Sequence, residues 1–141
     1  MNNYDVTVIG AGIVGLGTAY KLLEKDSSLR ICIIEKEERV AAHQTGHNSG
    51  VIHSGIYYKP GSLKAENCIT GYRMLLDFCD ENNIAYDICG KIIVATTEKE
   101  LKPLQTLFER GQSNGLDGVK YISADEIKET EPYAKGIKGI L

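Results

Sequence analysis

The fold is decided by the stretch Val6-Thr7-Val8-Ile9-Gly10-Ala11-Gly12-Ile13-Val14-Gly15. It begins with a short β-rich run and continues with three glycines in the spacing G-x-G-x-x-G. Glycines at this spacing close a tight turn after a strand, let the backbone approach a pyrophosphate, and let the next helix pack closely on the sheet. Apolar residues then recur at helical spacing over residues 13–25. The pattern predicts a strand, a glycine-rich turn and a helix.

A second apolar run, Ile31-Cys32-Ile33-Ile34, is typical of a strand buried in a parallel sheet, and it ends at Glu35. Glu35 follows Gly15 by 20 positions (35 minus 15), the interval at which an acid binds both ribose hydroxyls of a dinucleotide. An acid here favours an unphosphorylated ribose, and therefore FAD or NAD over NADP. The sequence thus predicts a site for the ADP half of a dinucleotide, with a purely structural βαβ unit as the alternative.

Length and composition narrow the class of protein. The chain has 141 residues and a net charge of −3, which gives no reason to expect nucleic acid as a partner. The early apolar run is broken by glycines and lacks a basic leader, so we expect a cytoplasmic protein. The four cysteines have no zinc or C-x-x-C spacing, and we expect neither metal nor disulfide. A dinucleotide-binding sheet has about five or six strands, and because only two precede the change in pattern we expect an amino-terminal fragment.

The pattern changes after residue 61. Ser62 is placed to cap a helix that ends near Asn82. Alternating residues then predict a strand over 84–89, a turn at Gly90 and a returning strand over 91–95. We therefore expect a dinucleotide-binding domain over residues 1–83 and the start of a substrate domain over residues 84–141.

The second predicted domain contains two more capped helices. Thr97 with Glu100 and Ser123 with Glu126 each form a capping box. Pro103 lies too deep for a first-turn proline, which predicts a kink or a late helix start. A short strand over residues 119–122 and the entry to another strand over 135–141 complete the prediction. The fold class is α/β, with a Rossmann-like βαβ unit followed by the start of an α+β domain.

Residues 43–61 hold all three histidines of the chain together with several glycines and hydroxyl and amide side chains. In a plain NAD-dependent Rossmann domain the chain enters a helix soon after the second strand. This segment instead suits a loop wrapped round a polar ligand.

The two signals together carry a family resemblance. The glycine motif with its acid, followed by Thr45-Gly46-His47-Asn48-Ser49-Gly50-Val51-Ile52-His53-Ser54-Gly55, resembles the FAD-dependent oxidoreductases of the D-amino-acid oxidase and glycerol-3-phosphate dehydrogenase superfamily. Within it, the run from His43 to Ala65 is most similar to the L-2-hydroxyglutarate oxidase or dehydrogenase family. The resemblance extends to Cys89-Gly90-Lys91 and Glu131-Pro132, and so covers the whole chain.

The resemblance implies that FAD is the cofactor. Hydroxyls, an amide and bare backbone at glycine are what a phosphate and a flavin ring edge require. The residues implied to hold the cofactor are Gly10, Gly12, Ile13, Val14, Gly15, Glu35, Lys36, Thr45, Asn48, Ser49 and Gly50.

The resemblance also implies a catalytic residue. A segment of the form I-H-x-G passes near the isoalloxazine ring in the superfamily, and His53 lies in such a segment. Because histidine exchanges protons near neutral pH, His53 is the candidate group that takes the substrate hydroxyl proton or orients the 2-hydroxy acid. A structural histidine and a covalent flavin attachment are the alternatives. Lys59 and Lys64 are candidates for binding substrate carboxylates, with solvated surface lysines as the alternative.

The implied reaction is oxidation of L-2-hydroxyglutarate to 2-oxoglutarate, with a hydride passing to the flavin while a base removes the hydroxyl proton. Oxygen or a quinone would accept the electrons, and the sequence leaves open a peripheral contact of the full-length protein with the inner face of a membrane. Oxidation of glycerol 3-phosphate or an amino acid on the same scaffold is one alternative, and a non-catalytic dinucleotide-binding module is another. Since the active site needs both domains, we expect these 141 residues alone to be inactive.

Overall fold

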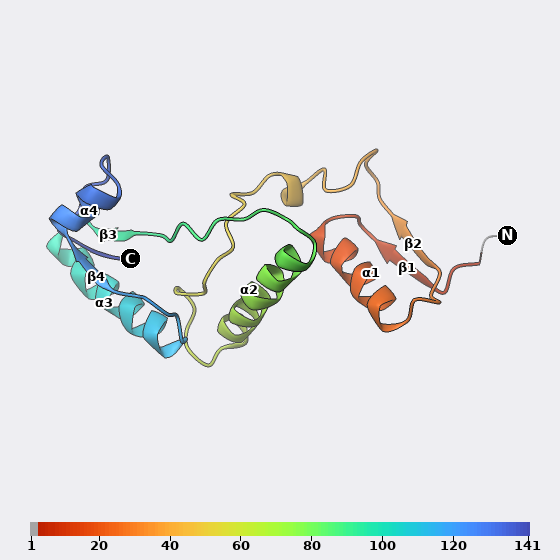
Figure 1. Ribbon diagram of the computed structural model, residues 1–141, viewed down its shortest axis with the longest axis horizontal. Helices are drawn as coiled ribbons and strands as arrows, with labels where there is room; N and C mark the ends of the chain where they lie inside the picture. The colour runs from red at the N-terminus through yellow and green to blue at the C-terminus, as the bar shows by residue number, and fades with distance from the viewer. Residues whose placement is uncertain (1–2) are drawn as a thin grey trace. The chain divides into compact units, whose positions relative to one another are not determined.

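The structure is a computed structural model that describes residues 3–141, in two compact units divided between Val51 and Ile52. The elements of the first unit are β1 (Val6–Ile9), α1 (Ile13–Lys25), β2 (Ile31–Ile34) and the 3-10 helix η1 (Gln44–Gly46) (Figure 1). Those of the second are α2 (Leu63–Glu81), β3 (Ile93–Ala95), α3 (Glu98–Ser113), β4 (Tyr121–Ser123), α4 (Ala124–Thr130) and β5 (Lys138–Ile140). No helix within residues 3–141 is both long and apolar enough to cross a membrane.

The first unit is a βαβ unit with two parallel strands. β1 pairs with β2 in a register that sets Val6 opposite Ile31 and Ile9 opposite Ile34. The start of this ladder is closed by Asp5, whose carboxylate accepts hydrogen bonds from the backbone N–H of Arg30 at 2.9 Å and from its guanidinium at 3.0 and 3.1 Å. The predicted strands, helix and α/β fold class are confirmed.

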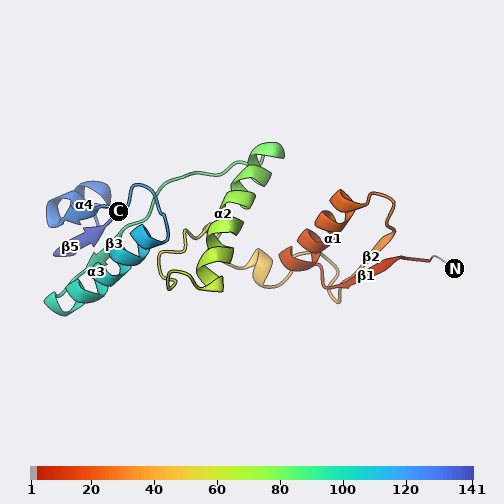
Figure 2. The same ribbon diagram turned by 90° about the horizontal axis from the view of Figure 1, so that it is seen from below.

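The second unit is built round a three-stranded antiparallel sheet in the order β3-β5-β4. Side chains alternate between the two faces of a strand, so β5 presents Ile140 to the cluster that contains Leu104 of α3 and Gly139 to Ile127 of α4. The helices α3 and α4 therefore cover opposite faces of this sheet (Figure 2). An antiparallel sheet with packed helices is the predicted α+β arrangement.

The predicted hairpin between residues 84–89 and 91–95 is wrong. Residues 84–92 form no strand, and β3 pairs with β5 instead. Tyr86 turns back to α2, where its hydroxyl donates to Asp80 Oδ1 at 2.9 Å, and Ile88 is 70% exposed. The alternation of residues 84–89 therefore does not mark two faces of a sheet.

The predicted helix boundaries agree with the structure. Ser62 Oγ accepts the backbone N–H of Ala65, and α2 ends at Glu81, with Asn82 as its C-cap. Glu100 Oε2 accepts the backbone N–H of Thr97 at 3.0 Å, and α3 begins at Glu98. Of the two effects expected of Pro103, a late helix start is therefore wrong. The second capping box forms at the start of α4, and the predicted strand over 119–122 is found as β4, which begins two residues later and ends one residue later.

The two compact units do not correspond to the predicted domains. The first unit ends at Val51, and α2 belongs to the second unit. The division of the protein into a dinucleotide-binding domain over residues 1–83 and a substrate domain over 84–141 stays a prediction.

Candidate flavin-binding site

The glycine-rich turn joins the end of β1 to the start of α1. Gly10 has φ +99°, a conformation that favours glycine, and its N–H donates to Ile34 O at 2.7 Å. A Cβ on Gly15 would overlap the carbonyl oxygen of Gly10 and lie 3.3 Å from Val8 Cγ1. Gly15 therefore lets the first turn of α1 lie directly against the turn and β1.

The segment that follows β2 folds back over the start of α1. Thr45 Oγ1 accepts the backbone N–H of Ile13 at 3.0 Å, and the N–H of Ala41 donates to Ala11 O at 3.0 Å. A Cβ on Gly12 would lie only 3.2 Å from Thr45 Oγ1. Gly12 therefore permits the close approach of Thr45 to the helix terminus.

Glu35 binds the backbone on both sides of the turn. Its Oε2 accepts the N–H of Ala11 at 2.7 Å, and its Oε1 accepts the N–H groups of Lys36 at 2.8 Å and Glu37 at 3.1 Å. These bonds hold the pKa of Glu35 below its ordinary value, and the bond from the Ala11 N–H has the largest effect. A carboxylate has about four acceptor positions, and three are used here. A ribose that binds Glu35 through both hydroxyls must share Oε2 or displace one backbone N–H.

The rest of the polar loop is held by its own side chains. Asn48 Nδ2 donates to the carbonyls of Gln44 at 3.1 Å and Thr45 at 2.8 Å, and Asn48 Oδ1 accepts the N–H of Gly50 at 2.7 Å. His43 Nε2 lies 2.9 Å from Glu37 Oε1. Asn48 thus fixes the shape of the loop that carries Thr45, while Ser49 is exposed.

The first unit contains an open cavity of about 420 Å³ beside the glycine turn. Five predicted cofactor residues line it: Gly10, Gly12, Glu35, Lys36 and Thr45. Six others lie in the same unit outside the lining: Ile13, Val14, Gly15, Asn48, Ser49 and Gly50. Lining residues that were not predicted as cofactor residues are Ile9, Ile34, Ala41, Ala42 and His43. The alanines carry no polar group that could mark them in the sequence.

The chemistry of this site fits the anionic half of FAD. The first turn of α1 contains no acidic residue, and in the described part of the chain the N–H groups of Val14 and Gly15 have no hydrogen-bond acceptor. A helix N-terminus with open N–H groups favours a phosphate. Val14 and Gly15 would hold the pyrophosphate, and Glu35 would hold the ribose.

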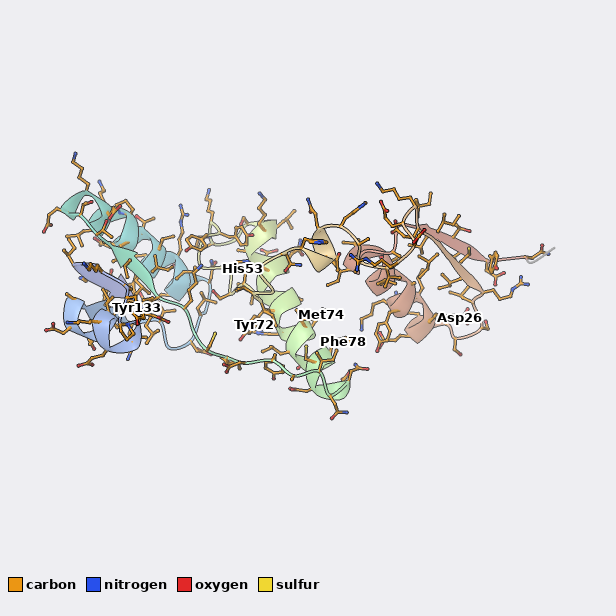
Figure 3. All side chains as sticks on the ribbon, turned by 90° about the horizontal axis from the view of Figure 1, so that it is seen from above. Asp26, His53, Tyr72, Met74, Phe78 and Tyr133 are labelled. Atoms are coloured by element: carbon orange, nitrogen blue, oxygen red, sulfur yellow. The ribbon has the colours of Figure 1, made fainter. Side chains whose placement is uncertain are left out.

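The remaining predicted residues lie in the second unit. His53 is exposed on the segment that precedes α2 (Figure 3), and its side chain makes no hydrogen bond to residues 3–141. Lys59 and Lys64 are exposed and form no ion pair within the described residues. The sequence analysis did not predict that Lys91 lies near this segment. Its Nζ is 4.9 Å from the ring centre of Tyr57.

Comparisons with known proteins agree with this chemistry. The model of the FAD dependent oxidoreductase family (DAO) matches residues 5–141. L-2-hydroxyglutarate dehydrogenase of Indibacter alkaliphilus is 51% identical over 138 residues, which are 98% of this chain and 35% of that protein. The Escherichia coli K12 protein of that name is 49% identical over 97% of this chain and 32% of its own length. The human mitochondrial L-2-hydroxyglutarate dehydrogenase is 48% identical over 99% of this chain and 30% of its own length.

The chain spans about a third of the length of these curated relatives. The match to the family nevertheless extends over both compact units, from the residue before β1 to the end of the chain. The chain belongs to the family of FAD-dependent oxidoreductases.

Proposed function

We propose that the protein oxidises the alcohol carbon of a 2-hydroxy acid, L-2-hydroxyglutarate, to the 2-oxo acid. The observation that carries this proposal is about 50% identity, over almost all of this chain, to proteins named L-2-hydroxyglutarate dehydrogenase. The glycine turn supports it, because the open N–H groups of Val14 and Gly15 at the start of α1 suit a phosphate, and Glu35 in the lining of the cavity suits a ribose. FAD, when bound, accepts the hydride equivalent from the substrate carbon.

The residues of this chain supply binding and proton transfer. The α1 terminus and the loop that carries Thr45 bind and orient the cofactor. The His53 imidazole takes the proton of the substrate hydroxyl, a role that its exposed side chain permits. Lys59 and Lys64 attract the two carboxylates of the substrate.

The test is anaerobic reduction of the protein in its full natural chain. A bound flavin absorbs at about 450 nm, and reduction bleaches this band. We expect L-2-hydroxyglutarate to bleach it and D-2-hydroxyglutarate to leave it unchanged, because only one hand of the substrate presents its hydrogen to the flavin. Bleaching by glycerol 3-phosphate or an amino acid alone would overturn the substrate, and a colourless protein would leave only a nucleotide-binding module.

His53 is tested by replacement with alanine. Loss of a general base slows the chemical step by about a hundredfold or more, so the limiting rate of flavin reduction should fall by this factor. Ser54→Ala, a change at the exposed neighbouring residue, is the control and should leave the rate unchanged. An unchanged rate in His53→Ala would assign His53 a structural role.

We further propose that the electrons pass to oxygen or to a quinone. A quinone acceptor would require peripheral contact with the inner face of a membrane. Mixing the reduced protein with oxygen or with a short-chain quinone distinguishes the two acceptors, because the faster reoxidation identifies the one that is used.

We also propose that the protein lies in the cytoplasm, a reducing compartment that suits its four free thiols.

A further inference from the structure

Side chains from α2 and from the C-terminal end of α3 bind the carbonyl groups of four residues in the segment that carries His53. Cys68 Sγ of α2 lies 3.2 Å from the carbonyl oxygen of His53 and donates to it. Asn114, at the C-terminus of α3, donates through Nδ2 to the carbonyls of Gly55 at 3.2 Å and Tyr58 at 3.1 Å. Arg110 Nη1 donates to the carbonyl of Tyr57 at 3.0 Å.

Asn114 is the centre of this arrangement. It is 9% exposed and is the buried polar residue of the described chain. The two carbonyls that it binds belong to one turn, in which the N–H of Tyr58 donates to Gly55 O at 3.0 Å. Between them, Ile56 is buried in the core cluster with Leu104 of α3. A single amide group therefore closes this turn against the end of α3.

These contacts hold the backbone of the segment but not the side chain of His53. The backbone is bound at His53, Gly55, Tyr57 and Tyr58, and a Cβ placed on Gly55 would lie 3.5 Å from Cys68 Sγ. The His53 side chain projects from the start of this fixed segment without a partner among residues 3–141. A group that must meet a substrate proton within hydrogen-bond reach gains from such a rigid support.

We propose that Asn114, assisted by Arg110, is a positioning residue of the oxidation: it locks the turn of residues 55–58 and thereby sets where the His53 imidazole stands. This inference rests on the proposed function of His53. Asn114 acts through the backbone and touches neither substrate nor cofactor in this role. Its loss should therefore change the rate of the chemical step more than the affinity for substrate.

The variant that tests this is Asn114→Asp in the full natural chain with FAD bound. It keeps the shape of the side chain but replaces the donor with an acceptor that faces two carbonyls. We expect the limiting rate of flavin reduction by L-2-hydroxyglutarate to fall by about tenfold to a hundredfold, as for a misplacement of about 1 Å. The substrate dissociation constant from the same titration should change by less than about twofold. Amide exchange of Tyr58 should accelerate by about tenfold, because its turn is released.

The matched control is Asn82→Asp. Asn82 is also the C-cap of a helix and donates through Nδ2 to a backbone carbonyl, that of Phe78, at 2.9 Å. This change should leave the reduction rate within about twofold of the unmodified protein. If Asn114→Asp does not fold, Arg110→Met decides in its place. It removes only the bond to Tyr57 and should slow reduction roughly threefold, about what one hydrogen bond contributes.

The outcomes separate this inference from the function on which it rests. Failure of L-2-hydroxyglutarate to reduce the unmodified protein overturns the proposed function and the positioning role together. Normal reduction in the unmodified protein and in Asn114→Asp alike overturns the positioning role alone. Faster amide exchange with an unchanged reduction rate also overturns it, because Asn114 would then stabilise the fold only.

Discussion

The two compact units differ in how much of their apolar surface they bury. In the second unit Ile122 of β4 and Ile140 of β5 are buried, and Ile127 of α4, packed against the sheet, is 0% exposed. In the first unit the isoleucine that ends β1, Ile9, is 87% exposed, and Val14 at the start of α1 is 80% exposed. The second unit thus has a hydrophobic core of its own. The βαβ unit buries little apolar surface, and its backbone geometry is set by hydrogen bonds.

This difference indicates what holds each unit together. Burial of apolar surface stabilises the second unit. The first is held by hydrogen bonds to backbone groups: Glu35 to Ala11, Thr45 to Ile13 and Asp5 to Arg30. Such bonds fix geometry well but add little net stability. A site for a phosphate needs this geometry, because its donors are backbone N–H groups.

The largest expected effect tests the contrast in burial directly. Ile127→Ala in the 141-residue chain should lower the free energy of unfolding of the second unit by about 2–5 kcal/mol, the usual cost of emptying a core site. Ile9→Ala, the same substitution at an exposed site, should change stability by about 0.5 kcal/mol or less. Urea denaturation followed by circular dichroism measures both. Equal effects would show that the two units do not differ in the way their exposures indicate.

The next effect concerns the backbone of the glycine turn. Gly15→Ala places a methyl group against the carbonyl of Gly10 and must shift α1 away from the turn. Strain of this kind costs about 1–3 kcal/mol, which corresponds to a loss in affinity for FAD of roughly fivefold to 150-fold. We expect the full natural chain with this change to lose FAD on gel filtration.

The control for this change lies two residues further along the same helix. A Cβ on Gly17 meets nothing within 4 Å, so Gly17→Ala should retain FAD and stabilise the helix by about 0.5–1 kcal/mol. Full FAD occupancy in Gly15→Ala would mean that the turn tolerates a displaced helix. The view that the first unit depends on the exact geometry of its backbone would then be wrong.

The sequence predicted the first unit well because its signals are local. The strands, the helix and the glycine spacing lie within residues 6–35, and the five predicted residues that line the cavity come from this motif and the loop that follows it. The hairpin after residue 83 was wrong because pairing in the second unit is non-local. Ala95 of β3 lies opposite Lys138 of β5, 43 positions later (138 minus 95). Alternation in residues 84–89 contains no information about that partner.

The same limit explains the residues that sequence reasoning missed. Asn114 follows a helix and would be interpreted as a C-cap, but its acceptors lie 59 and 56 residues away, at Gly55 and Tyr58. Ala41 lines the cavity and has φ 57°, a conformation that alanine rarely adopts. The local sequence predicts neither the hydrogen bonds of Asn114 nor the conformation of Ala41, because both depend on contacts between distant segments.

The smallest expected effect is the pH dependence of the Asp5–Arg30 pair, which closes the open end of the two-stranded ladder. The hydrogen bonds from the Arg30 guanidinium and backbone N–H lower the pKa of Asp5 to about 2 from its ordinary 3.8. Because the folded value is the lower one, the pair contributes its full stability above about pH 4, and this is lost as pH falls through about 2. The contribution is small, because both side chains are exposed to solvent.

Carbon-detected NMR titration of Asp5 in the 141-residue chain measures this directly. We expect a midpoint near 2 at low salt, and a midpoint closer to 3.8 in Arg30→Gln, which removes the guanidinium but keeps the backbone donor. Asp5→Asn should remove the corresponding part of the acid-induced loss of stability, while Asp26→Asn, a change at another exposed aspartate of the same unit, should not alter the Asp5 titration. A midpoint near 3.8 in the unmodified chain would mean that the Asp5 carboxylate does not bind Arg30. The first unit would then lack one of the three backbone contacts that hold it in place of a core.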